Sequence, residues 1–240
     1  MLSKFISIGD KIELQAIGRS VKRSPEQPEK VYSSQVFDIL SEDKIEIVMP
    51  MEKTKLILLS VDSEYELVLY GDTGLYQCNV RIVDRYKSHN VYILAVELIS
   101  DLRKYQRREY YRFSCALEMN IRCLEPEEQL ALENKEAFEP VEGIPFAKGV
   151  IVDISGGGLR FLSANKFDSD SLVAVNFYLT RNQERKRYEA IGRIISVKEL
   201  ENRSRTYEHR IQYLNMKREI RDEIIKYIFE AERKGMKKER

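Results

Sequence analysis

A chain of 240 residues is long for one small barrel and suits two compact domains, since an independent core typically needs roughly 100 to 150 residues. Hydrophobic residues at 43% and charged residues at 33% argue against a disordered chain or a membrane protein. The formal net charge of +1, from 40 basic and 39 acidic residues, gives no overall basicity that would favour a nucleic-acid polymer as partner.

Residues 1–99 are predicted to form a first β-domain. Short segments rich in β-branched, aromatic and leucine residues follow one another there, a pattern typical of an all-β fold. Turn residues separate them, as at 71–74 and 87–90. A small barrel is the natural closure because it leaves no exposed sheet edge. The expected strands are 11–17, 35–40, 44–48, 55–61, 65–70, 75–86 and 91–98.

The polar segment 100–109 is rich in arginine and is predicted to be a linker. Strand-like sequence resumes after it, where Leu117, Met119 and Ile121 alternate with polar neighbours. We therefore predict a mainly β protein with two small β-barrel domains in tandem, the second at 110–240. Its expected strands are 112–123, 148–154, 159–162, 172–179, 188–197 and 205–214.

Two helices are predicted in the second domain. A short acidic helix is expected within the insertion 124–146, where Pro126 stands at a suitable start and glutamates follow it. The segment 216–238 is expected to be a longer helix, because Ile220, Ile224 and Ile228 form a stripe among charged residues. That stripe predicts packing against a barrel.

The expected cellular location follows from the cysteines, the histidines and the hydropathy of the chain. Three cysteines without C-x-x-C spacing and two distant histidines favour neither a disulfide framework nor a zinc site. Residues 1–10 lack the apolar run of a secretory signal, and no stretch reaches the 18 apolar residues of a spanning helix. We expect a cytoplasmic protein without a transmembrane segment.

Arg107, Arg108 and Arg112 form the first candidate binding motif. Arginine suits a phosphodiester because its planar fork donates two hydrogen bonds and stays charged. Its flat face also stacks on a purine, so a guanine nucleotide offers arginine two kinds of contact. An arginine cluster alone is more often a solvated surface, and it gains meaning only beside a second motif.

The second candidate motif is the hexamer 153–158, which contains Asp153, Ser155, Gly156, Gly157 and Gly158. The Asp153 carboxylate can accept hydrogen bonds from the donor edge of guanine, and the Ser155 hydroxyl can add a contact. We expect the three glycines to adopt positive φ and to let the backbone approach a ligand closely. A tight turn between two strands is the alternative interpretation, and the two are compatible.

Together the motifs resemble the signatures of the PilZ domain, an R-x-x-x-R segment and a D/N-x-S-x-x-G loop. Arg108 and Arg112 match the first, and Asp153, Ser155 and Gly158 match the second. The resemblance implies a six-stranded barrel that binds cyclic di-GMP and needs no further cofactor. The implied ligand-binding residues are Arg107, Arg108, Arg112, Asp153, Ser155, Gly157 and Gly158. The segment 8–14 resembles the opening of the N-terminal barrel of YcgR-like flagellar brake proteins.

The resemblance also implies a stoichiometry and an output. In this family the residue before R-x-x-x-R is associated with the number of ligands, and an arginine there, Arg107, implies two cyclic di-GMP molecules per chain. Ligand capture is expected to order the linker and change the interdomain arrangement. The implied partner is a flagellar stator or rotor protein, which would recruit the chain to the motor. The alternative is a PilZ-like interaction module that regulates polysaccharide export or secretion, with or without ligand.

Two other functional classes are alternatives to a receptor. The sequence has no HExxH, G-x-S-x-G or P-loop lysine, and Asp153 with Ser155 lacks a third catalytic partner, so we expect no enzyme. Tyr110 and Tyr111 beside the arginines could stack bases of a nucleic acid. Tyrosines in alternating strand sequence are more often barrel core or rim, and the many acidic residues also argue against a nucleic-acid polymer.

Overall fold

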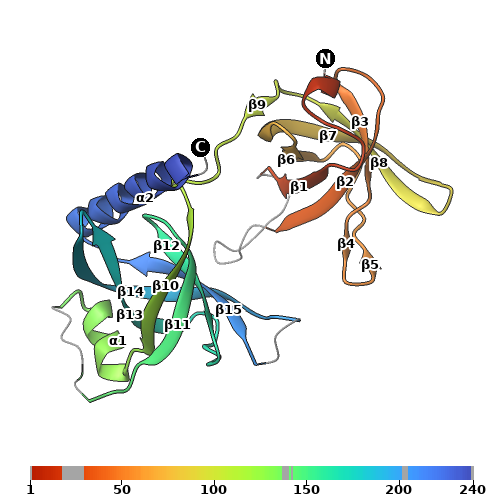
Figure 1. Cartoon of the computed structure of the whole chain (residues 1–240). Coiled ribbons are helices and arrows are strands. Elements are labelled where there is room, and N and C mark those ends of the chain that lie inside the picture. Colours follow the sequence, from red (N-terminus) through yellow and green to blue (C-terminus); the bar gives the residue numbers. More distant parts are fainter. Residues whose placement is uncertain (1, 18–29, 137–140, 142, 202–204, 239–240) are drawn as a thin grey trace. The chain divides into compact units, whose positions relative to one another are not determined.

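The structure is a computed structural model, and it describes residues 2–17, 30–136, 141, 143–201 and 205–238. The chain divides into two compact units, Met1–Arg107 and Arg108–Arg240. Each unit contains a closed six-stranded barrel (Figure 1). The prediction of a mainly β protein with two barrels in tandem is therefore confirmed.

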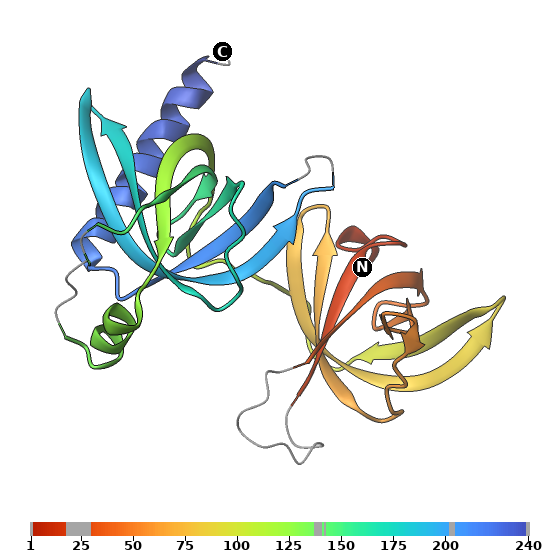
Figure 2. The ribbon, with the colours of Figure 1, turned by 90° about the horizontal axis from the view of Figure 1, so that it is seen from below.

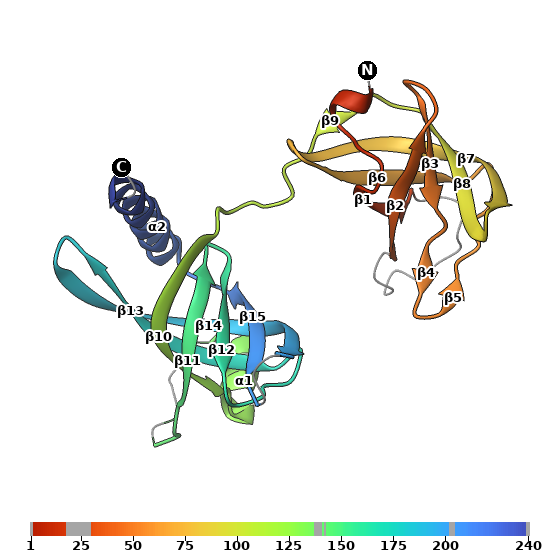
Figure 3. The same cartoon turned by 45° about the vertical axis from the view of Figure 1, so that its right-hand side comes forward.

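The first barrel closes in the order β6-β1-β2-β3-β8-β7, because β6 pairs with both β1 and β7. A further short strand, β9, adds to β7 and so pairs part of the expected linker with this unit. The hairpin of β4 and β5 extends from the barrel (Figure 3). The elements are η1 (Leu2–Lys4), β1 (Lys11–Ala16), β2 (Val31–Ile39), β3 (Lys44–Val48), β4 (Met51–Glu52), β5 (Lys55–Leu56), β6 (Glu64–Gly71), β7 (Gly74–Ser88), β8 (Val91–Leu98) and β9 (Arg103–Lys104).

The second barrel is closed in the order β10-β11-β12-β15-β14-β13, and all its pairs are antiparallel. Irregularities in the register lie between β10 and β11, β11 and β12, and β14 and β15; such bulges add the bend that closure requires. The strands are β10 (Phe113–Cys123), β11 (Ala147–Ile154), β12 (Gly158–Ser163), β13 (Leu172–Arg181), β14 (Glu184–Glu199) and β15 (Tyr207–Leu214).

Alternating side chains fill each barrel. In β1, Ile12 and Leu14 are fully buried while their neighbours are not. In β10, Met119 and Ile121 enter the second core, as their spacing predicts. Burial of one such side chain stabilises the fold by about 1.5–3 kcal/mol. A register shift of one residue would turn all of these side chains to the other face, so their burial fixes the register of the strands.

The two predicted helices are present in the second unit. α1 (Pro126–Glu133) begins at the expected proline, and α2 (Arg218–Lys238) covers most of 216–238. Ile224 and Ile228 of α2 are buried in the core of the barrel, as the stripe predicts. The two helices lie on different parts of this barrel (Figure 2). No helix in the described ranges is long and apolar enough to cross a membrane.

Two long hairpins have tight two-residue turns. In the first unit, His89 and Asn90 connect β7 to β8 with φ of 46° and 70°. In the second, Asn182 and Gln183 connect β13 to β14 with φ of 48° and 70°. Positive φ at both central residues is what the common type I′ hairpin turn requires, because it follows the twist of the strands.

Candidate ligand-binding site

The two sequence motifs meet at one end of the second barrel. The arginine-rich segment ends where β10 begins, and β10 pairs with the end of β11 through Phe113 opposite Ile154 and Ser114 opposite Asp153. Arg112 therefore directly precedes the strand position that faces the end of β11. Arg108 and Arg112 are both exposed, and each has an interaction within the structure.

Ser155 shapes the turn between β11 and β12. Its N–H and its hydroxyl both donate to the Gly158 carbonyl oxygen, at 2.8 and 3.0 Å. The same hydroxyl accepts from the Gly157 N–H at 3.3 Å. Ser155 is 8% exposed, so in this structure its hydroxyl organises the turn from within. This geometry supports the turn interpretation of the motif.

The expectation of positive φ at the three glycines is wrong. Among the described glycines only Gly9, Gly74 and Gly143 have positive φ. Gly156 and Gly158 are required for a different reason, which is close approach of other atoms. A Cβ on Gly158 would lie 2.0 Å from the Ile211 carbonyl oxygen, and one on Gly156 would lie 2.6 Å from the Tyr110 ring. β15 and Tyr110 pack so closely against the turn that they leave no room for a side chain at Gly158 and Gly156.

Tyr110 joins the arginine segment to the glycine turn. Its ring packs over Gly156 and Gly157, and Ile225 of α2 also approaches Gly156. The Tyr110 hydroxyl accepts a hydrogen bond from Arg221 of α2 at 3.1 Å, and the guanidinium lies 5.5 Å from the centre of the ring. A hydrogen bond with Glu109 is the main cause that raises the pKa of Tyr110 above its ordinary value. The segment 108–112 is thus held against the turn.

Tyr111 fastens the same segment to the far part of α2. Its hydroxyl donates to a Glu232 carboxylate oxygen at 2.6 Å, although the side chain is 53% exposed. Tyr110 and Tyr111 therefore contact α2 at Arg221 and Glu232, about three helical turns apart. The helix and the arginine segment form one connected surface beside the glycine turn.

Asp153 is engaged by an arginine that the sequence motif does not include. Its Oδ2 accepts a hydrogen bond from Arg160 Nε at 2.5 Å, and Arg160 Nη1 also contacts Glu208 at 2.9 Å. These carboxylates, Asp153 first, raise the pKa of Arg160. The β12 arginine thereby fixes the direction of the Asp153 carboxylate and leaves its other oxygen for a second donor.

Arg107 lies in the first unit. Its guanidinium donates to the Tyr70 hydroxyl at 2.7 Å and to Glu13 at 3.3 Å. Burial acts to raise the pKa of Glu13, but hydrogen bonds from Lys11 and Tyr70 and the nearby charges of Lys11 and Arg107 lower it overall. Arg107 therefore has partners on its own barrel, whereas the Asp153–Gly158 turn belongs to the second unit.

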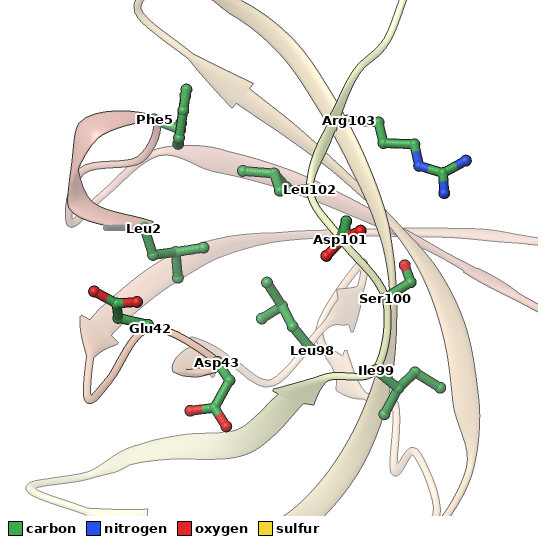
Figure 4. Close-up of a pocket in the computed structure, with 10 residues that line it drawn as sticks. All are labelled: Leu2, Phe5, Glu42, Asp43, Leu98, Ile99, Ser100, Asp101, Leu102 and Arg103. Carbon is green, nitrogen blue, oxygen red and sulfur yellow. The ribbon is translucent and has the colours of Figure 1, made fainter.

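A separate cavity of about 640 Å³ lies in the first unit (Figure 4). Leu2, Leu98 and Leu102 point toward a common space there, and three carboxylates line it against one arginine, Arg103. An excess of carboxylates repels a phosphodiester, so this cavity is not suited to a nucleotide. Within the described ranges, no three His, Cys, Asp or Glu side chains are grouped as metal ligands.

Residues 106–230 match the family model of the PilZ domain. The chain belongs to the PilZ domain family. Residues 7–98 match the model described as the flagellar protein YcgR, so both halves of this PilZ protein have a family assignment. A search of the curated proteins finds no match.

Comparison with solved structures finds one that shares the fold of this PilZ protein and others that are similar to it. The inhibitor of motility MotI/DgrA from Bacillus subtilis is 18% identical, with 98% of this chain and 100% of that one covered and a TM-score of 0.72. YcgR from Escherichia coli, solved in complex with c-di-GMP, is 14% identical, with 96% and 87% covered and a TM-score of 0.47. MrkH from K. pneumonia, also solved with c-di-GMP, is 14% identical, with 95% and 90% covered and a TM-score of 0.40.

Three residues of this PilZ site were missed from the sequence. Tyr110 was interpreted as barrel core or rim, whereas it covers the glycine turn. Arg160 could have been predicted from the sequence, because it follows the last glycine by two residues and pairs with Asp153 across the two strands. Arg221 could not, since only the packing of α2 brings it to the Tyr110 hydroxyl.

Proposed function

We propose that this PilZ protein is a receptor for cyclic di-GMP that acts on a partner protein and catalyses no reaction. The observation that carries the proposal is the meeting of the R-x-x-x-R segment with the D-x-S-x-x-G turn at the β10–β11 end of a PilZ barrel. Arg108 and Arg112 are the proposed phosphate and purine contacts. Asp153, Gly157 and Gly158 are proposed to meet the guanine and the sugar-phosphate from the turn, with Ser155 holding the turn in shape.

Arg107 is proposed to bind the ligand together with Arg108. Its guanidinium also donates to Tyr70 and Glu13 of the first unit, so ligand binding and these contacts compete for one guanidinium. This exchange supports a change of interdomain arrangement on binding. Allosteric couplings are typically about 1 to 3 kcal/mol, or roughly 5- to 150-fold in affinity, which suffices for a graded switch.

Isothermal titration with cyclic di-GMP tests the site. The parent chain is expected to bind two molecules, and Arg108→Ala and Asp153→Ala are expected to abolish saturable heat. Arg193→Ala and Asp222→Ala are matched controls, because both side chains are exposed and lie outside the site. Arg107→Ala is expected to reduce the stoichiometry to one. A parent chain that binds no cyclic di-GMP contradicts the receptor, whereas one ligand per chain contradicts only the role of Arg107.

The proposed output is reduced motility through a flagellar stator or rotor protein, within the cytoplasm. The match of residues 7–98 to the flagellar protein YcgR and the shared fold with an inhibitor of motility support this partner class. A component of polysaccharide export or secretion is the alternative partner. Affinity capture from a motile host, with and without cyclic di-GMP, is expected to recover a motor protein only with ligand; recovery of an export or secretion component instead favours the alternative.

A further inference from the structure

A second cavity of about 820 Å³ lies in the PilZ barrel and shares no residue with the candidate cyclic di-GMP site. Its volume falls within the roughly 300–1,000 Å³ that small-molecule sites typically have. Apolar side chains of five elements line it, α1, β13, β14, β15 and α2, among them Leu132, Ile191 and Ile220, and Phe146 joins them from the residues just before β11. Leu132 and Phe146 belong to the insertion 124–146, which the proposed function does not use.

Arg122 is a buried polar residue in the wall of this cavity. It is 4% exposed, and its two terminal nitrogens bind the Glu128 carboxylate at 2.6 Å each. Its Nε is itself buried, and no described residue accepts a hydrogen bond from it. Arg122 therefore forms part of the wall with its guanidinium nitrogens already bound or buried, so a ligand that carries a charge must meet its partner elsewhere in the lining.

Positive charge also gathers at the cavity rim near the start of α2. Lys135 and Lys217 line the cavity, and neither ammonium is ion-paired with a described residue. Arg187 is paired with Glu189 at 2.7 Å, which leaves Glu136 as the other unpaired charge of the lining. Lys217 precedes the first turn of α2 and its side chain cannot accept a hydrogen bond, so the first N–H groups of the helix have no side-chain cap from it.

We propose that this cavity binds a small amphipathic carboxylate, such as a fatty acid of medium chain length. The apolar walls take the hydrocarbon body, and the carboxylate lies toward the ammonium groups of Lys135 and Lys217, which line the cavity and have no ion-pair partner among the described residues. A cyclic dinucleotide fits the cavity poorly, because both terminal nitrogens of Arg122 and one of Arg187 are already bound to carboxylates. The inference goes beyond the cyclic di-GMP receptor and does not depend on it.

Amide NMR of the isotope-labelled full chain tests this site with sodium decanoate, held below its micelle concentration, and with decanol as an uncharged probe of equal length. Decanoate is expected to shift the amides of Leu132, Ala174 and Ile220 to saturation while Asp153 and Gly157 stay unmoved. Decanol is expected to bind about tenfold more weakly, since it lacks the charge-assisted hydrogen bonds.

Two variants separate this site from general hydrophobic binding. Ala174→Phe fills the cavity and is expected to remove the shifts, whereas Ala164→Phe makes the same change at an exposed position outside it. Lys217→Gln is expected to weaken decanoate several-fold and leave decanol unchanged; Lys148→Gln is its control, and this pair carries the test if Ala174→Phe does not fold. The proposal is overturned by unsaturable shifts, by equal binding of decanoate and decanol, or by decanoate that binds Ala174→Phe as well as Ala164→Phe.

Discussion

Arg107 donates a hydrogen bond to the Tyr70 hydroxyl at 2.7 Å, and its guanidinium carbon lies 5.6 Å from the centre of the Tyr70 ring. Both residues belong to the first unit. The residue proposed to set ligand stoichiometry therefore has partners within its own unit, and a contact of cyclic di-GMP with the Arg107 guanidinium would compete with them.

Tyr70→Phe is expected to tighten cyclic di-GMP binding by about 2- to 10-fold, because it removes one hydrogen bond of roughly 0.5–1.5 kcal/mol that competes for Arg107. Isothermal titration measures the change. Tyr92→Phe is the matched control, since Tyr92 lies on the same barrel and contacts Lys87 rather than Arg107. Unchanged or weaker binding in Tyr70→Phe would mean that Arg107 does not have to leave Tyr70.

Gly156→Ala is expected to weaken cyclic di-GMP binding and to destabilise the second barrel by about 1–3 kcal/mol, the usual cost of overpacking. The added methyl group would lie 2.6 Å from the Tyr110 ring and 2.9 Å from Ile225, so the arginine segment must move away from the turn. Titration and thermal unfolding measure the two effects. Gly235→Ala should leave binding unchanged and should not destabilise the barrel, because a Cβ there meets no atom within 4 Å and alanine favours the helix more than glycine does.

The alternation of apolar residues predicted the β-fold and its longer strands well. It predicted the short strands poorly. The expected strands 44–48 and 91–98 are observed at those bounds, because buried side chains define them. Of the expected strand 55–61 only Lys55 and Leu56 are paired. Strand β9 was missed because Arg103 and Lys104 have no apolar pattern, and backbone pairing with Tyr76 and Gln77 alone makes it a strand.

The sequence predicted the two motifs of the candidate site but not how their residues are arranged in space. The sequence places Asp153 near a glycine turn, but nothing local tells that Tyr110 and Ile225 press on Gly156. The prediction of positive φ failed for this reason, since glycine is needed there for space and not for a left-handed backbone. Contacts between residues far apart in the sequence decide which property of a glycine matters.

Glu128→Gln is expected to destabilise the second barrel by about 3–5 kcal/mol, because it leaves the buried Arg122 charge without its partner. The Glu128 carboxylate also accepts from the N–H groups of Glu125 and Val141, both at 2.8 Å. Urea unfolding followed through β10 amide signals measures the loss. Glu127→Gln, on the same turn of α1 but exposed, should stay near the parent; equal midpoints for the two variants would contradict a structural role for the ion pair.

The same ion pair predicts a response to acid. Hydrogen bonds from Arg122 lower the pKa of Glu128 from 4.5 to about 2. The stabilisation is complete above the unfolded pKa of 4.5 and is lost as the pH falls toward about 2, because the unfolded chain binds the proton first. Unfolding midpoints measured between pH 6 and pH 2 should fall more steeply for the parent than for Glu128→Gln.

His209 predicts a second pH dependence at higher pH. It is fully buried, its Nε2 accepts from the Phe167 N–H at 3.1 Å, and burial lowers its pKa below 6.5. Below pH 6.5 the unfolded chain binds the proton before the folded one, so the stability of the second barrel should fall from pH 7 to pH 5. His209→Gln should flatten this slope in thermal unfolding, and the exposed His89→Gln should keep it; a slope that survives in His209→Gln would assign it to another group.

The turns at His89–Asn90 and Asn182–Gln183 give each barrel an exposed tip on which a fluorophore can be placed. Neither His89 nor Gln183 is glycine, so the backbone at each already holds a Cβ at positive φ, and a cysteine replaces either without a new steric demand. With the exposed native Cys123 changed to serine, the pair His89→Cys and Gln183→Cys would carry a donor and an acceptor dye. Single-molecule energy transfer between the dyes measures the distance between the two barrel tips. A ligand titration would then show whether the barrels move between discrete arrangements or through a continuous range of distances.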